Sequence, residues 1–358
     1  MFIGDIMAHD QQLESAKRGA SWDFSPQFRR VRPLFYDSLA VGNLETVFAG
    51  EKRGYAGYPS FNTPDELAGS LADLGIRVLT LSTNHILDRG VSGAARTISV
   101  LDNAGISWTG LGHGDVAPND ALLIDYGGLK WAFVNYCYGS NAPLPEYNSS
   151  DDVHLNVISQ NAVAEGLRKA QNTSPDVIVA CFHWGSEYSL VPSEEQRRMA
   201  AFSIENGASL VIGTHPHVLQ TVEIASSDRG PALVAYSLGN FVSFQRTLPR
   251  ERSVVLAIDV EKMPHESARL ARVSIAPVAV SATKHKSRRL VEVVYGGTSP
   301  IFNHSGLAAA ELRRARLAGE RVLEYLGAAK TPEADGFYVL WDASSPDKLP
   351  MPRSKTLE

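Results

Sequence analysis

Along most of the chain, apolar and polar positions follow two patterns, one typical of strands and one typical of helices. Short apolar runs bounded by turn residues predict buried strands, and longer stretches with apolar residues at helical spacing predict helices. The predicted strands lie at 1–3, 41–45, 78–82, 122–124, 131–134, 177–182, 210–212 and 233–236. The predicted helices lie at 63–74, 91–104, 157–171 and 193–206. This alternation is typical of an α/β protein. In the first helix, Thr63 is expected as the N-cap, with Pro64 at the first helical position.

The pattern changes after Phe244. Strands at 253–260, 272–280 and 290–294 follow one another without helices between them, which predicts antiparallel strands that complete a second sheet. A charged helix at about 305–326 and a strand at 336–341 come next. No internal repeat or long linker divides the chain, so a single domain is expected over residues 1–344, with second-sheet completion at 250–344. Residues 345–358 are expected to form a poorly ordered tail.

Composition and charge narrow the class of protein. The chain has 358 residues, of which 44% are hydrophobic, as in ordinary globular proteins. The net charge of −5 and the dispersed basic residues do not favour a nucleic-acid partner. The sequence contains neither a membrane-spanning run nor a signal peptide. Because the first apolar run is short, two alternatives stay open: the natural chain begins at this residue, or it begins further upstream. A cytoplasmic location is expected in the first case and a cell-envelope location in the second.

Five segments each place a metal-competent side chain directly after an apolar run. In open α/β sheets, binding sites gather at the carboxyl ends of the strands, so we expect these side chains to converge in one cleft. Imidazole, carboxylate and amide groups together suit Mn, Fe or Zn better than Ca or Mg alone. The candidate metal ligands are Asp5, Glu45, Asn84, His183, His215 and His217.

A ligand set of this kind fits hydrolysis by two divalent ions about 3.5–4 Å apart. A carboxylate between the ions, either Glu45 or Asp5, would offset their mutual repulsion. Each segment alone also has an ordinary structural interpretation: surface loop histidines at 215 and 217, a strand-end histidine at 183, and turn formers at Asp5 and Asn84. Five such segments in this order make coincidence the weaker explanation.

The same segments resemble a known family in their order and spacing. The motifs are Gly4-Asp5, Asn43-x-Glu45, Asn84-His85-x-x-Asp88-x-Gly90, His183-Trp184-Gly185, Gly213-x-His215-Pro216-His217 and Ser237-Leu238-Gly239-Asn240-Phe241. They resemble the CapA-type family of poly-γ-glutamate capsule synthesis proteins, a branch of the calcineurin-like metallophosphoesterase superfamily. The resemblance spans roughly residues 4–244, about two-thirds of the chain.

The resemblance implies a four-layer α/β/β/α sandwich of two mixed sheets, with the metals held by loops at one edge. Carried over by motif, Asp5 and His217 would bind one ion, and Asn84, His183 and His215 the other. Glu45 would occupy the bridging position. His85 would contact phosphate and protonate the leaving oxygen, with Asp88 as its catalytic partner. Asn43 and Asn240 are assigned to the substrate pocket, although local backbone bonding is an ordinary alternative for Asn43.

Three departures from the superfamily pattern affect this expectation. Asp5-Ile6-Met7 lacks the histidine of an Asp-x-His motif, which leaves open whether His9 reaches the first ion. Glu45 replaces an aspartate and lengthens the bridging arm by one methylene group. Asp88 lies three residues after His85 instead of directly after it, and we expect it to orient His85 through a hydrogen bond.

Three functions remain in competition. The leading one is a dinuclear metal-dependent phosphoesterase that cleaves a small-molecule or polymer phosphate mono- or diester. The second uses the same fold to bind or export poly-γ-glutamate with membrane-associated capsule machinery, without phosphatase turnover. It needs a basic surface near the metals, for which Arg29, Arg30 and Arg32 are candidates, unless they form a solvated helix face. The third is a metal-stabilised structural or partner-binding module, which the mixed ligand set disfavours.

Overall fold

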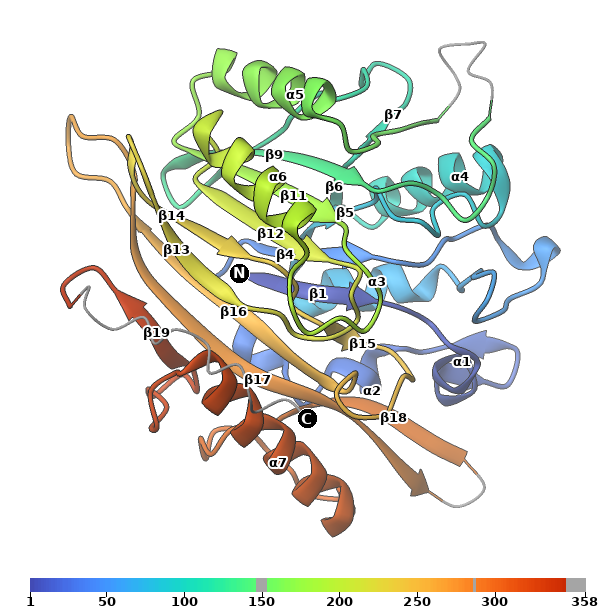
Figure 1. Ribbon diagram of the computed structural model, residues 1–358. Coiled ribbons are helices and arrows are strands. Elements are labelled where there is room, and N and C mark those ends of the chain that lie inside the picture. Colours follow the sequence, from blue (N-terminus) through green and yellow to red (C-terminus); the bar gives the residue numbers. More distant parts are fainter. Residues whose placement is uncertain (146–152, 286–287, 346–358) are drawn as a thin grey trace.

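The computed structural model describes residues 1–145, 153–285 and 288–345, and it contains two large mixed sheets (Figure 1). The first sheet runs in the order β18-β17-β16-β1-β4-β5-β6, with β15 beside β1 and β19 beside β17. Its N-terminal strands are parallel. Its strands are β1 (Phe2–Ile6), β4 (Ala40–Leu44), β5 (Ile76–Thr80), β6 (Ser107–Thr109), β15 (Asn240–Val242), β16 (Arg252–Glu261), β17 (Arg269–His285), β18 (Arg288–Tyr295) and β19 (Tyr338–Asp342).

The second sheet has the order β13-β14-β12-β11-β9-β8, with four parallel strands between antiparallel edges. Its strands are β8 (Leu122–Tyr126), β9 (Leu129–Cys137), β11 (Val177–His183), β12 (Leu210–Thr214), β13 (Val222–Ser227) and β14 (Gly230–Ala235). Two short antiparallel pairs lie outside the large sheets: β2 (Lys17–Arg18) with β3 (Ser21–Trp22), and β7 (Leu111–Gly112) with β10 (His154–Leu155).

Helices cover the outer face of each sheet (Figure 1). The second sheet is covered by α5 (Gln160–Asn172) and α6 (Glu194–Glu205). The first sheet is covered by α1 (Asp10–Ala16), α2 (Ser25–Phe28), α3 (Glu66–Leu74), α4 (Gly90–Asn103) and α7 (Ala309–Leu326). Short 3₁₀ turns lie at Arg32–Phe35 and Glu51–Arg53.

The side-chain alternation of β11 shows why the sheets form separate layers. Val177, Val179 and Cys181 belong to the apolar core shared by the two sheets. The intervening Ile178, Ala180 and Phe182 belong to the core beneath α5 and α6. A strand buried on both faces reads as one continuous apolar run, which is how the sequence presents it. The predicted four-layer α/β/β/α sandwich is therefore confirmed.

The late antiparallel strands were expected to complete a second sheet, and this expectation was wrong. β16 pairs with β1 through Phe2–Leu256 and Ile3–Val255, so β16–β19 extend the sheet that β1 and β4 begin. The separate second sheet is built from β8, β9 and β11–β14 instead. The absence of helices between these strands correctly indicated antiparallel pairing. The partner of β16, however, is β1, which lies about 250 residues away in sequence and gives no local signal.

Two local expectations also need correction. Thr63 does not cap α3, which begins at Glu66 after Asp65. The Thr63 hydroxyl lies 2.7 Å from the Thr46 hydroxyl in a buried pair, and its backbone N–H donates to Val47. The first strand extends to Ile6 instead of ending at residue 3, because Gly4 packs closely against Gly239, where a Cβ would lie 1.8 Å from the carbonyl oxygen.

The described part of the chain contains no helix with the length and apolar character needed to cross a bilayer. Both cysteines, Cys137 and Cys181, are buried and free within adjacent strands. The predicted tail lies, from residue 346 onward, outside the described residues.

Candidate metal centre

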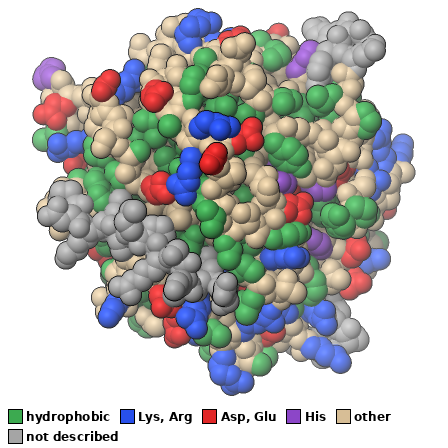
Figure 2. All heavy atoms as spheres, viewed as in Figure 1, with side chains coloured by type: hydrophobic (Ala, Val, Ile, Leu, Met, Phe, Trp, Pro, Cys, Tyr) green, Lys and Arg blue, Asp and Glu red, His purple; other side chains and the backbone are tan. Residues whose placement is uncertain are grey.

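The six predicted ligands meet at the edge where strands of both sheets end. Asp5 lies near the end of β1, and Glu45 follows β4. Asn84 lies in the loop after β5, and His183 is the last residue of β11. His215 and His217 follow β12. All six side chains are at least 97% buried. Figure 2 shows a group of histidine side chains on this face, with acidic and basic side chains beside them.

Glu45 is at the centre of the cluster. Its Oε1 lies 3.6 Å from Nε2 of His183 and 3.6 Å from Nε2 of His217. Both carboxylate oxygens are buried and receive no hydrogen bond, and Nδ1 of His215 is likewise buried and unpaired. A buried carboxylate without a donor is unfavourable unless a cation neutralises it. The residues therefore fit metal ions.

Two groups of ligand atoms overlap at Glu45. Asp5, Glu45 and His183 form one group, and Glu45, His215 and His217 form the other, with ligand atoms within 4.8 Å of one another in each. Asn84 Oδ1 adds to the first group, because it lies 2.8 Å from Nε2 of His183. A carboxylate shared by two groups is the geometry expected between two ions. The division of ligands between the ions stays a prediction, since the family pattern pairs Asp5 with His217.

The loop after β12 holds its two histidines in an uncommon backbone conformation. His215 has φ 93° and His217 has φ 57°, both in the left-handed region that non-glycine residues rarely adopt. The backbone N–H of His215 donates to Asp5 Oδ2 at 3.3 Å, and His217 Nδ1 lies 3.1 Å from the same oxygen. Backbone strain of this kind concentrates at functional sites, and here it turns both rings toward Glu45.

Asn43 and Asn240 were predicted to line the substrate pocket, but the structure places both beneath the ligands. Each is 1% exposed. Asn43 Nδ2 donates to Asp5 Oδ1 at 2.9 Å and lies 3.3 Å from His183 Nδ1. Asn240 Oδ1 accepts from His217 Nδ1 at 3.0 Å. Their short side chains end on ligand atoms, so their role is to orient the ligands.

Removing the Asn240 side chain should therefore weaken metal binding without removing a ligand. We expect Asn240→Ala to lower the affinity for Mn²⁺ about 10- to 100-fold, because the His217 ring loses the acceptor that fixes its orientation. Asn206→Ala serves as the control, since it removes a side-chain amide that bonds only within α6. Calorimetric titration with Mn²⁺ measures both. Equal affinities in the two variants would contradict this role.

Burial and mutual charge set the protonation of the ligands. Burial lowers the pKa of His183 well below its usual range. Burial and the neighbouring His217 lower the pKa of His215 to about 4. Burial also opposes charge on His217, but Glu45 and Asp5 outweigh it and raise its pKa to about 9. Burial raises the pKa of Glu45. His183 and His215 are thus neutral, as metal ligands must be.

The raised pKa of His217 predicts how metal binding depends on pH. Below about pH 9, His217 carries a proton that must leave before its ring can bind a metal. The affinity for Mn²⁺ should therefore rise about tenfold per pH unit from neutral pH toward that pKa and then level off. Calorimetry in buffers of different ionisation enthalpy should also detect the released proton. An affinity that is independent of pH over this range would contradict the prediction.

His85 and Asp88 form the hydrogen bond that the sequence predicted. Nδ1 of His85 lies 2.8 Å from Asp88 Oδ2, which also accepts from the backbone N–H of Phe61 at 2.7 Å. The Phe61 ring packs edge-on against His85 at 4.8 Å between centroids. Nε2 of His85 accepts from Asn141 Nδ2 at 3.3 Å. The imidazole is thus held on one nitrogen and directs the other toward the site.

His9 is in neither group of candidate ligands. Its Nδ1 accepts from the backbone N–H of Phe244 at 3.2 Å, and its ring packs edge-on against Phe61. Burial lowers its pKa to about 4. The structure therefore supports a packing role for His9 beside the site and gives no geometric support to its use as a ligand.

Several residues at the mouth of the site were not predicted. The Tyr138 ring lies 4.6 Å from the His215 ring, and the Tyr188 ring lies 6.1 Å from the His217 ring. Both tyrosines are partly exposed, at 46% and 37%. Tyr138 and Asn141 directly follow the end of β9, so their position after a strand was a usable signal. Tyr188 lies in a loop, and only the folded structure reveals its place.

Two of the three arginines considered as a binding surface for an acidic polymer, Arg29 and Arg30, form contacts within the fold. Arg30 forms an ion pair with the buried Glu292 at 2.9 Å, and Arg29 contacts the same oxygen at 3.4 Å. Arg30 also donates to the backbone oxygens of Asn303 and Ser305. These contacts connect α2 to β18 and the loop that follows it. Arg29 and Arg30 therefore hold the fold together, and neither contacts a candidate ligand.

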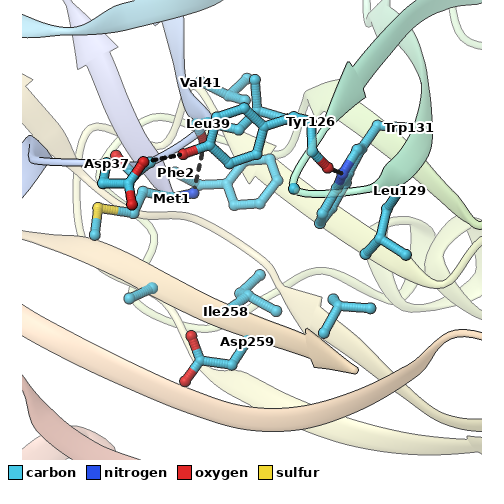
Figure 3. A pocket seen from close by; sticks show the side chains of 14 residues that line it. Met1, Phe2, Asp37, Leu39, Val41, Tyr126, Leu129, Trp131, Ile258 and Asp259 are labelled. Carbon is cyan, nitrogen blue, oxygen red and sulfur yellow. Dashed lines mark hydrogen bonds between the residues drawn. The ribbon is translucent and has the colours of Figure 1, made fainter. Parts of the chain in front are cut away.

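A cavity of about 250 Å³ lies at the opposite edge, between the beginnings of β1 and β4 and the strands β9 and β16 (Figure 3). Phe2, Leu129, Trp131 and Ile258 give it a largely apolar lining. Its carboxylates, Asp37 and Asp259, have no histidine beside them in the lining. Within the described residues, both groups of candidate metal ligands lie at the carboxyl edge and not in this cavity.

The fold and the cluster together define the class of protein. Two mixed sheets lie between helical layers, and histidine, carboxylate and amide side chains converge at one edge, so the chain is a layered α/β protein with a candidate metal centre. Residues 1–245 match the model of the family described as "Bacterial capsule synthesis protein PGA_cap". The chain belongs to this family, and the resemblance seen in its motifs is confirmed.

Relatives with curated descriptions are similar over most of the same region. "Capsule biosynthesis protein CapA" of Bacillus anthracis is 28% identical over 252 residues, covering 67% of this chain and 58% of that protein. "PGA biosynthesis protein CapA" of Bacillus subtilis (strain 168) is 27% identical over 270 residues, covering 71% of this chain and 65% of that protein. The matched region thus spans about six tenths of the length of these relatives.

Among solved structures, the NAD nucleotidase (NadN) of Haemophilus influenzae matches with a TM-score of 0.44 and 12% sequence identity. That match covers 85% of this chain and 55% of the nucleotidase.

Proposed function

We propose that this protein is a dinuclear metal-dependent phosphoesterase. The observation that supports it most strongly is the Glu45 carboxylate, which is fully buried, has no hydrogen-bond donor and lies equally far from His183 and His217. A carboxylate in this position neutralises charge on both of its sides. Burial without a hydrogen-bond donor is unfavourable for a carboxylate, and bound cations would offset that cost.

Six side chains would hold the metals. Mn, Fe or Zn suits their mixed nitrogen and oxygen atoms. When bound, two such ions supply an activated water and stabilise charge on the phosphoryl oxygens. Tyr138 and Tyr188, whose rings lie beside His215 and His217, are partly exposed, so the ligands lie close to the surface, which favours a catalytic site over a closed structural one. The residues that would hold the ions are Asp5, Glu45, Asn84, His183, His215 and His217.

His85 would act on the leaving group. Its Nδ1–H donates to Asp88, which keeps the ring oriented and stabilises its protonated form. Nε2 then holds the proton that passes to the leaving oxygen. Asn141, whose amide contacts Nε2, keeps this atom directed toward the site in the absence of substrate.

The relatives suggest the biological setting. Two of them are described as capsule or PGA biosynthesis proteins. We therefore propose that the phosphoester, whether a small molecule or part of a polymer, belongs to the assembly of a capsule polymer at the cell envelope. The names also favour a second candidate function, the binding of poly-γ-glutamate without phosphoester turnover. Retention of the polymer by a protein that hydrolyses no phosphoester would support that candidate.

The phosphoesterase proposal can be tested with simple substrates. Protein reconstituted with Mn²⁺ should hydrolyse p-nitrophenyl phosphate or its diester. His215→Ala should lose metal content and activity together, because it removes a ligand whose Nδ1 has no other partner in the described structure. His265→Gln, in the exposed turn between β16 and β17, should change neither. Full metal content and rate in His215→Ala would show the assignment to be wrong.

A further inference from the structure

Arg250 presents an unpaired guanidinium group beside the candidate metal centre. Its Cζ lies 3.5 Å from the centroid of the Tyr188 ring. Among the residues that the structure describes, the guanidinium group of Arg250 forms neither an ion pair nor a hydrogen bond. Two nearby arginines differ in this respect, since Arg246 pairs with Glu311 and Arg314 pairs with Glu251. The N–H groups of Arg250 are therefore available to a ligand.

Arg250 and Tyr188 are both tied to the loop that holds the metal-site histidines. The backbone oxygen of Arg250 accepts from Asn240 Nδ2, and the same amide group orients His217. The backbone N–H of Tyr188 donates to Pro216 at 2.7 Å, between His215 and His217. The two residues are thus fixed relative to the candidate metal centre. The Tyr188 ring lies between the Arg250 guanidinium group and the His217 ring.

We propose that Arg250, stacked on Tyr188, binds a second anionic group of the substrate. The substrate would then be a phosphoester whose leaving part carries a carboxylate or a further phosphate. This inference rests on the proposed phosphoesterase function and names its substrate class. A guanidinium group that stacks by one face keeps its in-plane N–H groups free, and these match the two oxygens of a carboxylate or phosphate.

The neighbouring charges limit where that anion can lie. Burial and the adjacent Glu187 raise the pKa of Tyr188 to about 12, so the ring under Arg250 stays neutral. Glu187 is exposed, whereas the Arg250 guanidinium lies directly over the ring, so the anionic group is expected at the guanidinium. Figure 2 shows basic side chains beside the histidine group on this face.

Non-hydrolysable phosphonates test this inference by binding alone. Calorimetric titrations in Mn²⁺ would compare methylphosphonate, 3-phosphonopropanoate and propane-1,3-diyldiphosphonate, which differ in the second group. The unsubstituted protein should bind one or both of the doubly anionic compounds about tenfold more tightly than methylphosphonate, as expected for one charge-assisted contact. The better of the two identifies the second group as carboxylate or phosphate.

The variants then assign the preference to a residue. Arg250→Gln should abolish the preference, and Arg250→Lys should retain only part of it, because lysine lacks the planar fork. Arg289→Gln is the matched control. Arg289 also lies near an aromatic ring, that of Phe244, although it is exposed whereas Arg250 is half-buried, and its substitution should keep the full preference. Equal affinities for all three compounds, or a preference that survives Arg250→Gln, would overturn the inference. If the preference exists but p-nitrophenyl phosphate and its diester are not hydrolysed, the anion site stands and the phosphoesterase proposal fails.

Discussion

Glu45→Gln is expected to abolish phosphoesterase activity while leaving the metal-free fold nearly unchanged. The substitution preserves shape and removes the charge that lies between the two groups of ligands. Without it, we expect the protein to retain fewer than two ions. Loss of one ion removes several kcal/mol of transition-state stabilisation, so the rate should fall about 10³-fold or more.

The stability of the same variant gives an independent measurement. Neither oxygen of Glu45 receives a hydrogen bond, and the penalty of burying its charge opposes the attraction to protonated His217. Because these two effects offset each other, the metal-free free energy of unfolding should change by no more than about 1 kcal/mol. Mn²⁺ at about 1,000 times its dissociation constant should stabilise the unsubstituted protein by about 4 kcal/mol, and the variant should lose most of this gain. Denaturant unfolding with and without Mn²⁺ measures both quantities.

Glu292→Gln provides the matched control. Glu292 is also a buried carboxylate, but it is paired with Arg29 and Arg30. Its substitution should lower the free energy of unfolding by about 3 kcal/mol, since it leaves Arg30 buried without its partner. Metal content and the gain from Mn²⁺ should stay as in the unsubstituted protein. If Glu45→Gln behaved like Glu292→Gln, the role of Glu45 would be structural.

His85→Gln is expected to show the second large effect, a rate loss of about 10²- to 10⁴-fold at unchanged metal content. The loss should depend on the leaving group. An alkyl phosphate needs a proton on its leaving oxygen, whereas p-nitrophenolate leaves without one, so the alkyl substrate should suffer more. Asp88→Asn should cause a smaller loss of about 10- to 100-fold, since it weakens only the orientation of His85.

This leaving-group comparison separates proton transfer from simple disruption of the site. His265 is an exposed histidine in the turn between β16 and β17. The substitution His265→Gln should leave the rates of hydrolysis of both substrates unchanged. A loss in His85→Gln that is identical for alkyl and p-nitrophenyl phosphates would mean that His85 only positions the substrate. Metal content is measured on the same samples to exclude loss of the ions.

The apolar pattern predicted an α/β fold and the convergence of the ligands for a simple physical reason, whereas the four-layer arrangement was implied by the family resemblance. Strands buried on both faces, such as β11, are continuous apolar runs, and polar residues directly after them must lie at the carboxyl edge. Glu45 directly follows β4, and His183 and Asp5 lie within the last two residues of β11 and β1, at the same edge. The His85–Asp88 hydrogen bond could also be predicted, because both residues belong to one short loop.

Features that depend on distant pairing could not be predicted in this way. The place of β16 beside β1 is decided by contacts between chain segments about 250 residues apart. Asn43 and Asn240 carry the same amide group whether they face a pocket or support a ligand, and only the packing distinguishes the two. The stacking of Arg250 on Tyr188 joins two loops that share no sequence pattern.

The most direct test of the dinuclear centre is a crystal structure of the protein soaked in Mn²⁺, with an anomalous difference map collected near the manganese edge. We predict two peaks about 3.5–4 Å apart on either side of the Glu45 carboxylate. The imidazoles of His183, His215 and His217 should all lie within bonding distance of one or the other peak. A single peak, or none at Glu45, would contradict the account.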